Sequence, residues 1–266
     1  MNFRHGKVGT TTWMKHFTNL IPPNRQSVID WKHLNSPQLH ARIPQEFSSK
    51  FIEKNLQPGQ SLNDYFRQEG YFVFSFVRHP FDRLVSAYLD KIEGKGPMGE
   101  KGYRKLRFKL VEDYGSVNFQ NFLKHVRATL QNYEKCIYAG QNKKCDSGID
   151  VHWRPFYQRC AYCDMSYDFI GRMENFGADV MEVVERANLT SDISVEEALG
   201  LQSHFTSNDS LQHGQNTKLE EALALPIKAS PRALEYFAKV DKSLIKDLLK
   251  LYLKDFQLFQ YSSEGF

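Results

Sequence analysis

The sequence predicts an α/β fold in which a central, mainly parallel sheet is flanked by helices. Residues 72–77 and 167–171 are short apolar runs of strand length, rich in aromatic and β-branched residues, as strands buried on both faces are. Longer segments with helical periodicity alternate with these runs, which is typical of a parallel sheet covered on both faces. A chain of 266 residues can form one substantial core, so we expect a single domain over residues 1–266.

Sequence patterns also place the helices and loops around these strands. A helix over 81–92 follows Pro80, whose missing N–H costs nothing at the first helical position, and Asp82 suits the positive end of the helix dipole. Apolar residues recur at helical spacing in 117–129, and in 232–252 they form one long amphipathic stripe. The predicted helices are 10–20, 44–55, 81–92, 117–129, 179–188 and 232–252, and the predicted loops are 94–102, 131–150 and 203–216.

The first candidate site lies where the strand over 72–77 meets the next helix. Arg78 ends the strand, at the carboxyl edge where open α/β sheets bind ligands, and Ser86 follows about two helical turns later. A guanidinium and a hydroxyl in these positions could share one phosphate. The alternative is a purely structural strand and helix whose arginine pairs with a carboxylate.

The second candidate site is a glycine-containing loop near the N-terminus. Gly6 and Gly9 permit a tight turn whose backbone N–H groups, together with a helix N-terminus, can bind an anion. Lys7 adds a mobile cation, and Thr10, Thr11 and Thr12 add hydroxyl donors. The segment is not a Walker motif, because no Gly-Lys-Ser/Thr closes it. An ordinary helix N-terminus is the alternative interpretation.

Together, the two segments resemble the phosphosulfate-binding loop and the 3′-phosphate-binding strand–helix of Golgi carbohydrate sulfotransferases. The likeness is to the group that sulfates chondroitin, dermatan and related N-acetylgalactosamine-containing glycans. Residues 7–13 and 76–88 match the two motifs, and residues 152–163, 167–171 and 252–259 agree with further stretches of the family. The resemblance implies a P-loop-like sulfotransferase fold.

The resemblance also implies the donor and the residues that bind it. The expected donor is 3′-phosphoadenosine 5′-phosphosulfate, with no metal. Lys7 would neutralise charge on the leaving 5′-phosphate, and Arg78 and Ser86 would hold the 3′-phosphate. The expected donor-binding residues are Lys7, Val8, Gly9, Thr10, Thr11, Thr12, Arg78 and Ser86.

The sequence also offers candidate residues for the general base and for binding of the acceptor. A histidine is the usual general base, and His33 is the nearest histidine to the position at which related enzymes carry theirs. His152 and Trp153 could form an acceptor platform, although a buried aromatic anchor fits the same pattern. Arg104 and Lys105 lie in a basic run over 91–109 that could attract an acidic polysaccharide or a glycoprotein glycan. No nucleic-acid-binding motif accompanies this run.

The four cysteines and two sequons suit the secretory pathway. Four cysteines allow three pairings, of which Cys136–Cys145 with Cys160–Cys163 fits an oxidising lumen best; a zinc site is the alternative. Asn188 and Asn208 begin glycosylation sequons. The family resemblance implies the Golgi lumen and a single-pass type II anchor.

Two further expectations concern the N-terminus and the activity. Only residues 1–5 precede the glycine-containing loop, and no apolar run is long enough to span a bilayer, so we expect the N-terminus to be incomplete. A catalytically weak glycan-binding relative is the main alternative function, and a P-loop kinase-like enzyme is a further one.

Overall fold

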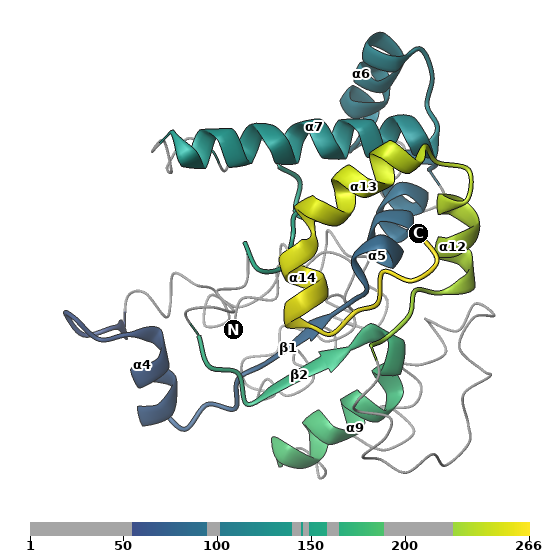
Figure 1. The fold of residues 1–266 in the computed structure, drawn as a ribbon. Helices are drawn as coiled ribbons and strands as arrows, with labels where there is room; N and C mark the ends of the chain where they lie inside the picture. The colour runs from purple at the N-terminus through teal and green to yellow at the C-terminus, as the bar shows by residue number, and fades with distance from the viewer. Residues whose placement is uncertain (1–54, 95–101, 140–144, 146–148, 159–164, 189–225) are drawn as a thin grey trace, which may run out of the picture. The chain divides into compact units, whose positions relative to one another are not determined.

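The computed structural model describes residues 55–94, 102–139, 145, 149–158, 165–188 and 226–266 (Figure 1). These residues belong to two compact units. One contains the described residues up to Val77 together with 165–188, and the other contains those from Arg78 to 158 together with 226–266. The single domain over 1–266 stays a prediction.

The first unit contains the parallel strand pair. Strand β1 (Phe74–Val77) pairs with β2 (Phe169–Arg172) in parallel, with Phe74 opposite Phe169. Helix α4 (Leu62–Gln68) precedes β1, and the 3₁₀ helix η5 (Met173–Asn175) leads from β2 into α9 (Phe176–Arg186) (Figure 1). The structure therefore confirms both predicted strands, their parallel pairing and the predicted helix near 179–188.

The two strands differ in burial, which corrects one prediction. All four residues of β1 are buried, as predicted. In β2 only Gly171 is buried, and Ile170 is 38% exposed, so the prediction of a strand buried on both faces is wrong for β2. Gly171 is needed for close packing, because a Cβ there would lie 2.5 Å from the Phe76 ring.

The second unit is helical. In chain order its elements are α5 (Pro80–Ala87), the π-helix η3 (Tyr88–Ile92), α6 (Arg104–Tyr114), α7 (Phe119–Tyr138), α12 (Pro231–Phe237), α13 (Lys242–Leu251) and α14 (Leu253–Leu258) (Figure 1). Pro80 is the first residue of α5, as predicted, and the His79 side chain caps this helix by accepting from the Phe81 amide. The predicted helix over 81–92 is thus confirmed, with a π-helical last turn.

Two predicted boundaries in this unit are wrong. Residues 131–138 belong to α7, although 131–150 was predicted as a loop from its polarity. Glutamine, glutamate and lysine are good helix formers, so polarity alone does not end a helix. The predicted helix over 232–252 is two helices, because α12 ends at Phe237 and the backbone of Asp241 (φ −57°, ψ 127°) is not helical just before α13 begins at Lys242. The predictions for 10–20, 44–54, 95–101 and 203–216 lie outside the described residues.

The core of the second unit joins the start of α5 to the C-terminal segment. Phe81 stacks on Phe237 with 4.3 Å between ring centroids. The fully buried Arg83 lies 3.7 Å from Asp255 and 3.9 Å above the Phe156 ring. Asp255 also accepts from the backbone amide of Phe156 at 2.8 Å, so α14 holds the segment that carries His152.

Candidate functional site

Arg78 and Ser86 stand out in the strand–helix segment by their exposure. From Arg78 to Tyr88 they are the only residues that are not buried. Ser86 is the one residue of α5 that is not buried, since the other seven are. The Arg78 side chain makes no ion pair within the described residues, whereas Arg83 pairs with Asp255. The arginine of this segment that pairs with a carboxylate is therefore Arg83. Arg78 and Ser86 remain partly accessible.

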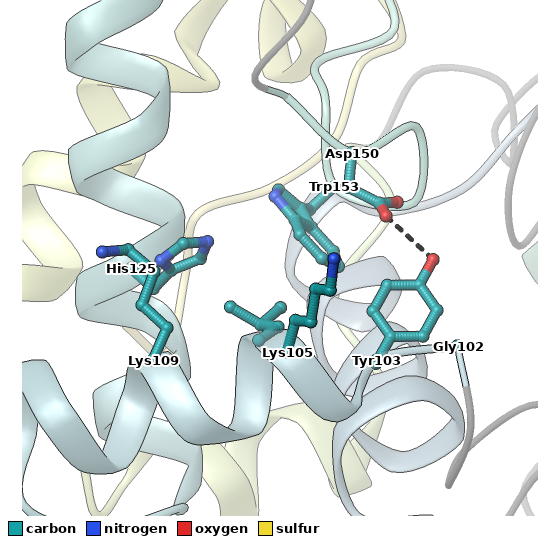
Figure 2. A pocket seen from close by; sticks show the side chains of 8 residues that line it. Gly102, Tyr103, Lys105, Lys109, His125, Asp150 and Trp153 are labelled. Atoms are coloured by element: carbon teal, nitrogen blue, oxygen red, sulfur yellow. Dashed lines mark hydrogen bonds between the residues drawn. The ribbon is translucent and has the colours of Figure 1, made fainter.

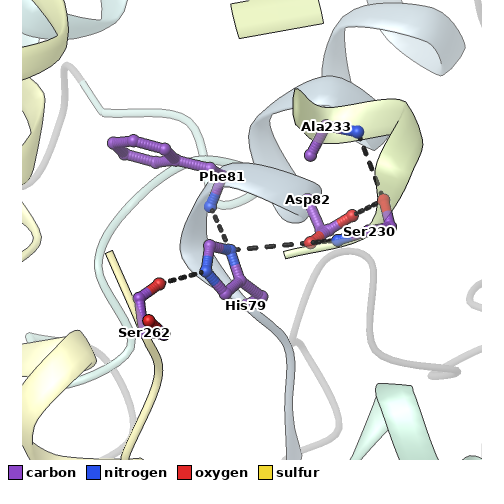
Figure 3. Close-up of polar contacts among 6 residues, drawn as sticks. All are labelled: His79, Phe81, Asp82, Ser230, Ala233 and Ser262. Atoms are coloured by element: carbon purple, nitrogen blue, oxygen red, sulfur yellow. Dashed lines mark hydrogen bonds and ion pairs between the residues drawn. The ribbon is translucent and has the colours of Figure 1, made fainter. Parts of the chain in front are cut away.

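A buried polar cluster fixes the start of α5 (Figure 3). His79 Nδ1 accepts from the Phe81 amide at 3.2 Å, so the Nε2–H donates to the Ser262 carbonyl, 3.0 Å away. Asp82 accepts from the amide and the hydroxyl of Ser230, and Ser230 in turn caps α12 by accepting from Ala233. Burial lowers the pKa of His79 and favours its neutral form.

A shallow pocket of about 310 Å³ lies in the same unit (Figure 2). Lys105 and Lys109 come from successive turns of α6, and His125 comes from α7. Burial, followed by the Lys109 charge, lowers the pKa of His125. The complete lining is Gly102, Tyr103, Lys105, Leu106, Lys109, His125, Asp150 and Trp153. Its two lysines can attract an anionic ligand.

Asp150 organises one wall of this pocket. Tyr103 donates its hydroxyl to Asp150 Oδ2 at 2.8 Å (Figure 2). Asp150 Oδ1 lies 2.5 Å from His152 Nδ1 and 2.8 Å from the His152 amide. Burial alone would raise the pKa of Asp150, but the hydrogen bonds from His152 and Tyr103 outweigh it and lower this pKa. Burial and the Asp150 charge raise the pKa of the Tyr103 hydroxyl.

The predicted acceptor residues have different positions. Lys105 and Trp153 line the pocket, and His152 contacts two lining residues. Arg104 does not line it, and its guanidinium lies 5.5 Å from the Phe108 ring centroid. Trp153 is 2% exposed and meets Phe122 edge-to-face at 5.3 Å, so most of its indole belongs to the core. A stacking role for Trp153 stays a prediction.

Sequence reasoning missed part of this site. It did not single out Tyr103, His125 or Asp150, and it named Lys109 only as part of the basic run. Asp150 could have been found, because an aspartate two residues before a histidine can reach the imidazole. Tyr103 lies 47 residues from Asp150, and no local pattern connects them.

Several of the remaining predicted site residues lie outside the described part of the chain. Lys7, Val8, Gly9, Thr10, Thr11, Thr12 and His33 lie outside the described residues. The predicted disulfide Cys136–Cys145 is confirmed, while Cys160 and Cys163 lie outside the described part. Within the ranges that the structure describes, no group of three His, Cys, Asp or Glu side chains could hold a metal ion. No helix among the described residues is long and apolar enough to cross a bilayer.

Comparison with known proteins defines the class of this protein. Residues 4–262 match the sequence profile of the Sulfotransferase family. The chain therefore belongs to the sulfotransferase family, and the family implies a P-loop-like fold. No solved structure gives a significant match to this chain.

Several carbohydrate sulfotransferases are similar to this chain. Carbohydrate sulfotransferase 10 of Danio rerio is 26% identical over 98% of this chain and 63% of its own length, and that of Xenopus laevis is 24% identical over 98% and 64%. Carbohydrate sulfotransferase 14 of Mus musculus is 27% identical over 74% of this chain and 44% of its own length. The chain thus spans less than two thirds of the length of these relatives.

Proposed function

We propose that this protein transfers a sulfuryl group from 3′-phosphoadenosine 5′-phosphosulfate to a hydroxyl group of a glycan. The observation that carries the proposal is the selective exposure of Arg78 and Ser86 in a segment that is otherwise buried. A guanidinium and a hydroxyl left accessible beside the end of a parallel strand suit a phosphate ligand. Membership in the sulfotransferase family supports this donor.

The roles of the donor-binding residues follow from the charges of the donor. Arg78 and Ser86 hold the 3′-phosphate and thereby orient the nucleotide. Lys7, with the N–H groups of residues 8–12, stabilises the negative charge that develops on the leaving 5′-phosphate oxygen. The sequence expectation of His33 as the base concerns a residue outside the described part of the chain, and no metal ion takes part in the proposed reaction.

The proposed acceptor is an acidic polysaccharide or a glycoprotein glycan that contains N-acetylgalactosamine. The lysines of the pocket, Lys105 and Lys109, supply positive charge for an acidic sugar. The similarity to carbohydrate sulfotransferases 10 and 14 supports a carbohydrate acceptor. The same resemblance favours the Golgi lumen, with membrane attachment through a type II anchor and no nucleic-acid partner.

A donor-binding and transfer assay tests this function. We expect sulfate transfer to desulfated chondroitin, detected by mass spectrometry, and tight binding of 3′-phosphoadenosine 5′-phosphate, measured by calorimetry. Arg78→Gln is expected to raise the Kd of this nucleotide about 10- to 100-fold, because hydrogen bonds to charged groups contribute roughly 1.5–3 kcal/mol. Lys7→Ala is expected to lower kcat about 10²- to 10³-fold. Arg67→Gln, at an exposed arginine of α4, is the matched control.

Other outcomes of this assay contradict the proposal. Glycan binding without nucleotide binding identifies the catalytically weak relative. A preference for adenosine triphosphate identifies a kinase-like enzyme. An effect of Arg78→Gln on kcat alone, with an effect of Lys7→Ala on nucleotide Kd alone, would overturn the assigned roles.

A further inference from the structure

His152 has the contacts of a histidine that is held at one ring nitrogen. Its Nδ1 lies 2.5 Å from Asp150 Oδ1 and 3.0 Å from the Tyr103 hydroxyl oxygen. The His152 amide also donates to Asp150 Oδ1 at 2.8 Å. The second ring nitrogen, Nε2, makes no hydrogen bond within the described residues. Among the residues that the structure describes, the imidazole is therefore held at Nδ1.

These contacts fix the tautomer of the neutral ring. An ionised carboxylate can only accept hydrogen bonds, and the lowered pKa of Asp150 keeps it ionised near neutral pH. The proton between Asp150 and His152 must then be on Nδ1, which leaves the lone pair on Nε2. A lone pair on an oriented imidazole is what a general base needs.

The position of His152 permits contact with an acceptor. Its side chain is 20% exposed, so solvent and a ligand can reach the ring. Both of its partners, Tyr103 and Asp150, line the pocket that also presents Lys105 and Lys109 (Figure 2). A sugar bound by these lysines would lie beside the residues that hold the imidazole.

We propose that His152 is the general base of the sulfate transfer, with Asp150 and Tyr103 as its positioning residues. This assignment rests on the proposed function and replaces the expectation that His33 takes this role. In the step, Nε2 of His152 takes the proton of the acceptor hydroxyl while the acceptor oxygen forms a bond to the donor sulfur. The bond from sulfur to the 5′-phosphate oxygen breaks, and its electron pair stays on that phosphate oxygen.

Matched histidine variants test the assignment. His152→Asn keeps an amide that can donate to Asp150 but removes the basic nitrogen. It is expected to lower kcat about 10²- to 10⁴-fold while leaving the Kd of 3′-phosphoadenosine 5′-phosphate within a few-fold of wild type. His33→Asn is the rival variant and is expected to keep kcat within a few-fold. Added imidazole is expected to restore part of the activity of His152→Ala, which a purely structural role would not allow.

Variants of the two partners test the positioning residues. Asp150 accepts from the His152 amide, and its Oδ1 lies 2.5 Å from His152 Nδ1, so it orients the imidazole. Asp150→Asn is expected to lower kcat at least tenfold while leaving the Kd of 3′-phosphoadenosine 5′-phosphate within a few-fold of wild type, because it removes the carboxylate that orients the ring. Tyr103→Phe is expected to lower kcat only a few-fold.

Three results would overturn the assignment. Wild-type kcat in His152→Asn, a loss in His33→Asn instead, or wild-type kcat in Asp150→Asn each contradicts it while leaving sulfate transfer in place. If the wild-type protein binds no 3′-phosphoadenosine 5′-phosphate and transfers no sulfate, the proposed function itself fails and the base assignment falls with it.

Discussion

At the residue scale, two arginines five positions apart have opposite environments. Arg83 is fully buried between Asp255 and the Phe156 ring, and its Nε and one terminal nitrogen have no hydrogen-bond partner in the part of the chain that the structure describes. Arg78 is partly exposed and has no ion pair within the described residues. A buried charge without its counter-ion is costly, so Arg83 depends on Asp255 for stability, while Arg78 remains available for a ligand.

Removal of Asp255 should therefore destabilise the fold strongly. Asp255→Ala is expected to lower the free energy of unfolding by about 3–5 kcal/mol, because it leaves Arg83 buried without a counter-ion. Urea denaturation measures this loss. The control is Asp247→Ala, which removes the partly exposed ion pair with Arg127 (3.1 Å) and is expected to cost less than about 1 kcal/mol. Equal losses in the two variants would contradict the interpretation.

His79 should make stability depend on pH. Burial lowers its pKa below the ordinary value near 6.5, so the unfolded chain binds more protons than the folded chain just below that pH. The contribution of His79 to stability is therefore present above about pH 6.5 and is lost as the pH falls through its folded pKa.

The test compares unfolding free energies of wild type and His79→Asn between pH 7.5 and 5. Asparagine can still cap α5, but it does not titrate. The wild-type protein is expected to lose more stability over this range than the variant does. Parallel pH curves for the two proteins would show that His79 does not contribute.

At the element scale, α7 is stabilised both by local sequence features and by a disulfide to a residue outside the helix. Asn118 caps α7 by accepting from the Asn121 amide, and buried apolar residues follow at helical spacing as far as Leu130. The last turns lack buried residues, and the disulfide between Cys136 and Cys145 ties them to the following segment. The length of α7 thus exceeds what its apolar stripe predicts.

Loss of this disulfide should weaken the end of α7. The sequence separation of 9 residues gives a loop-closure contribution of about 2.5 kcal/mol. The double variant Cys136→Ala/Cys145→Ala is expected to lose roughly this amount, with faster amide hydrogen exchange over residues 131–138. Reduction of the wild-type protein should reproduce the exchange pattern, and unchanged exchange in the variant would rule out the tethering role.

At the scale of the whole molecule, the proposed function makes the nucleotide a stabilising ligand. At 100 times its Kd, 3′-phosphoadenosine 5′-phosphate should add about 2.7 kcal/mol to stability, which raises Tm by roughly 5 °C or more. Adenosine 5′-monophosphate lacks the 3′-phosphate and should give a smaller shift. Thermal denaturation of Arg78→Gln should show nearly equal shifts with the two nucleotides. Equal shifts in the wild-type protein would argue against the 3′-phosphate site.

The sequence by itself determined the features that depend on neighbouring residues. The end of β1, Pro80 as the first residue of α5, and the family follow from short motifs, because strand burial and helix starts depend on residues a few positions apart. Only the tertiary structure distinguished the partly exposed Arg78 from the buried Arg83, divided 232–252 into two helices, and brought Tyr103 to Asp150 and His152. These outcomes depend on contacts between residues far apart in the chain, and local sequence patterns carry no record of such contacts.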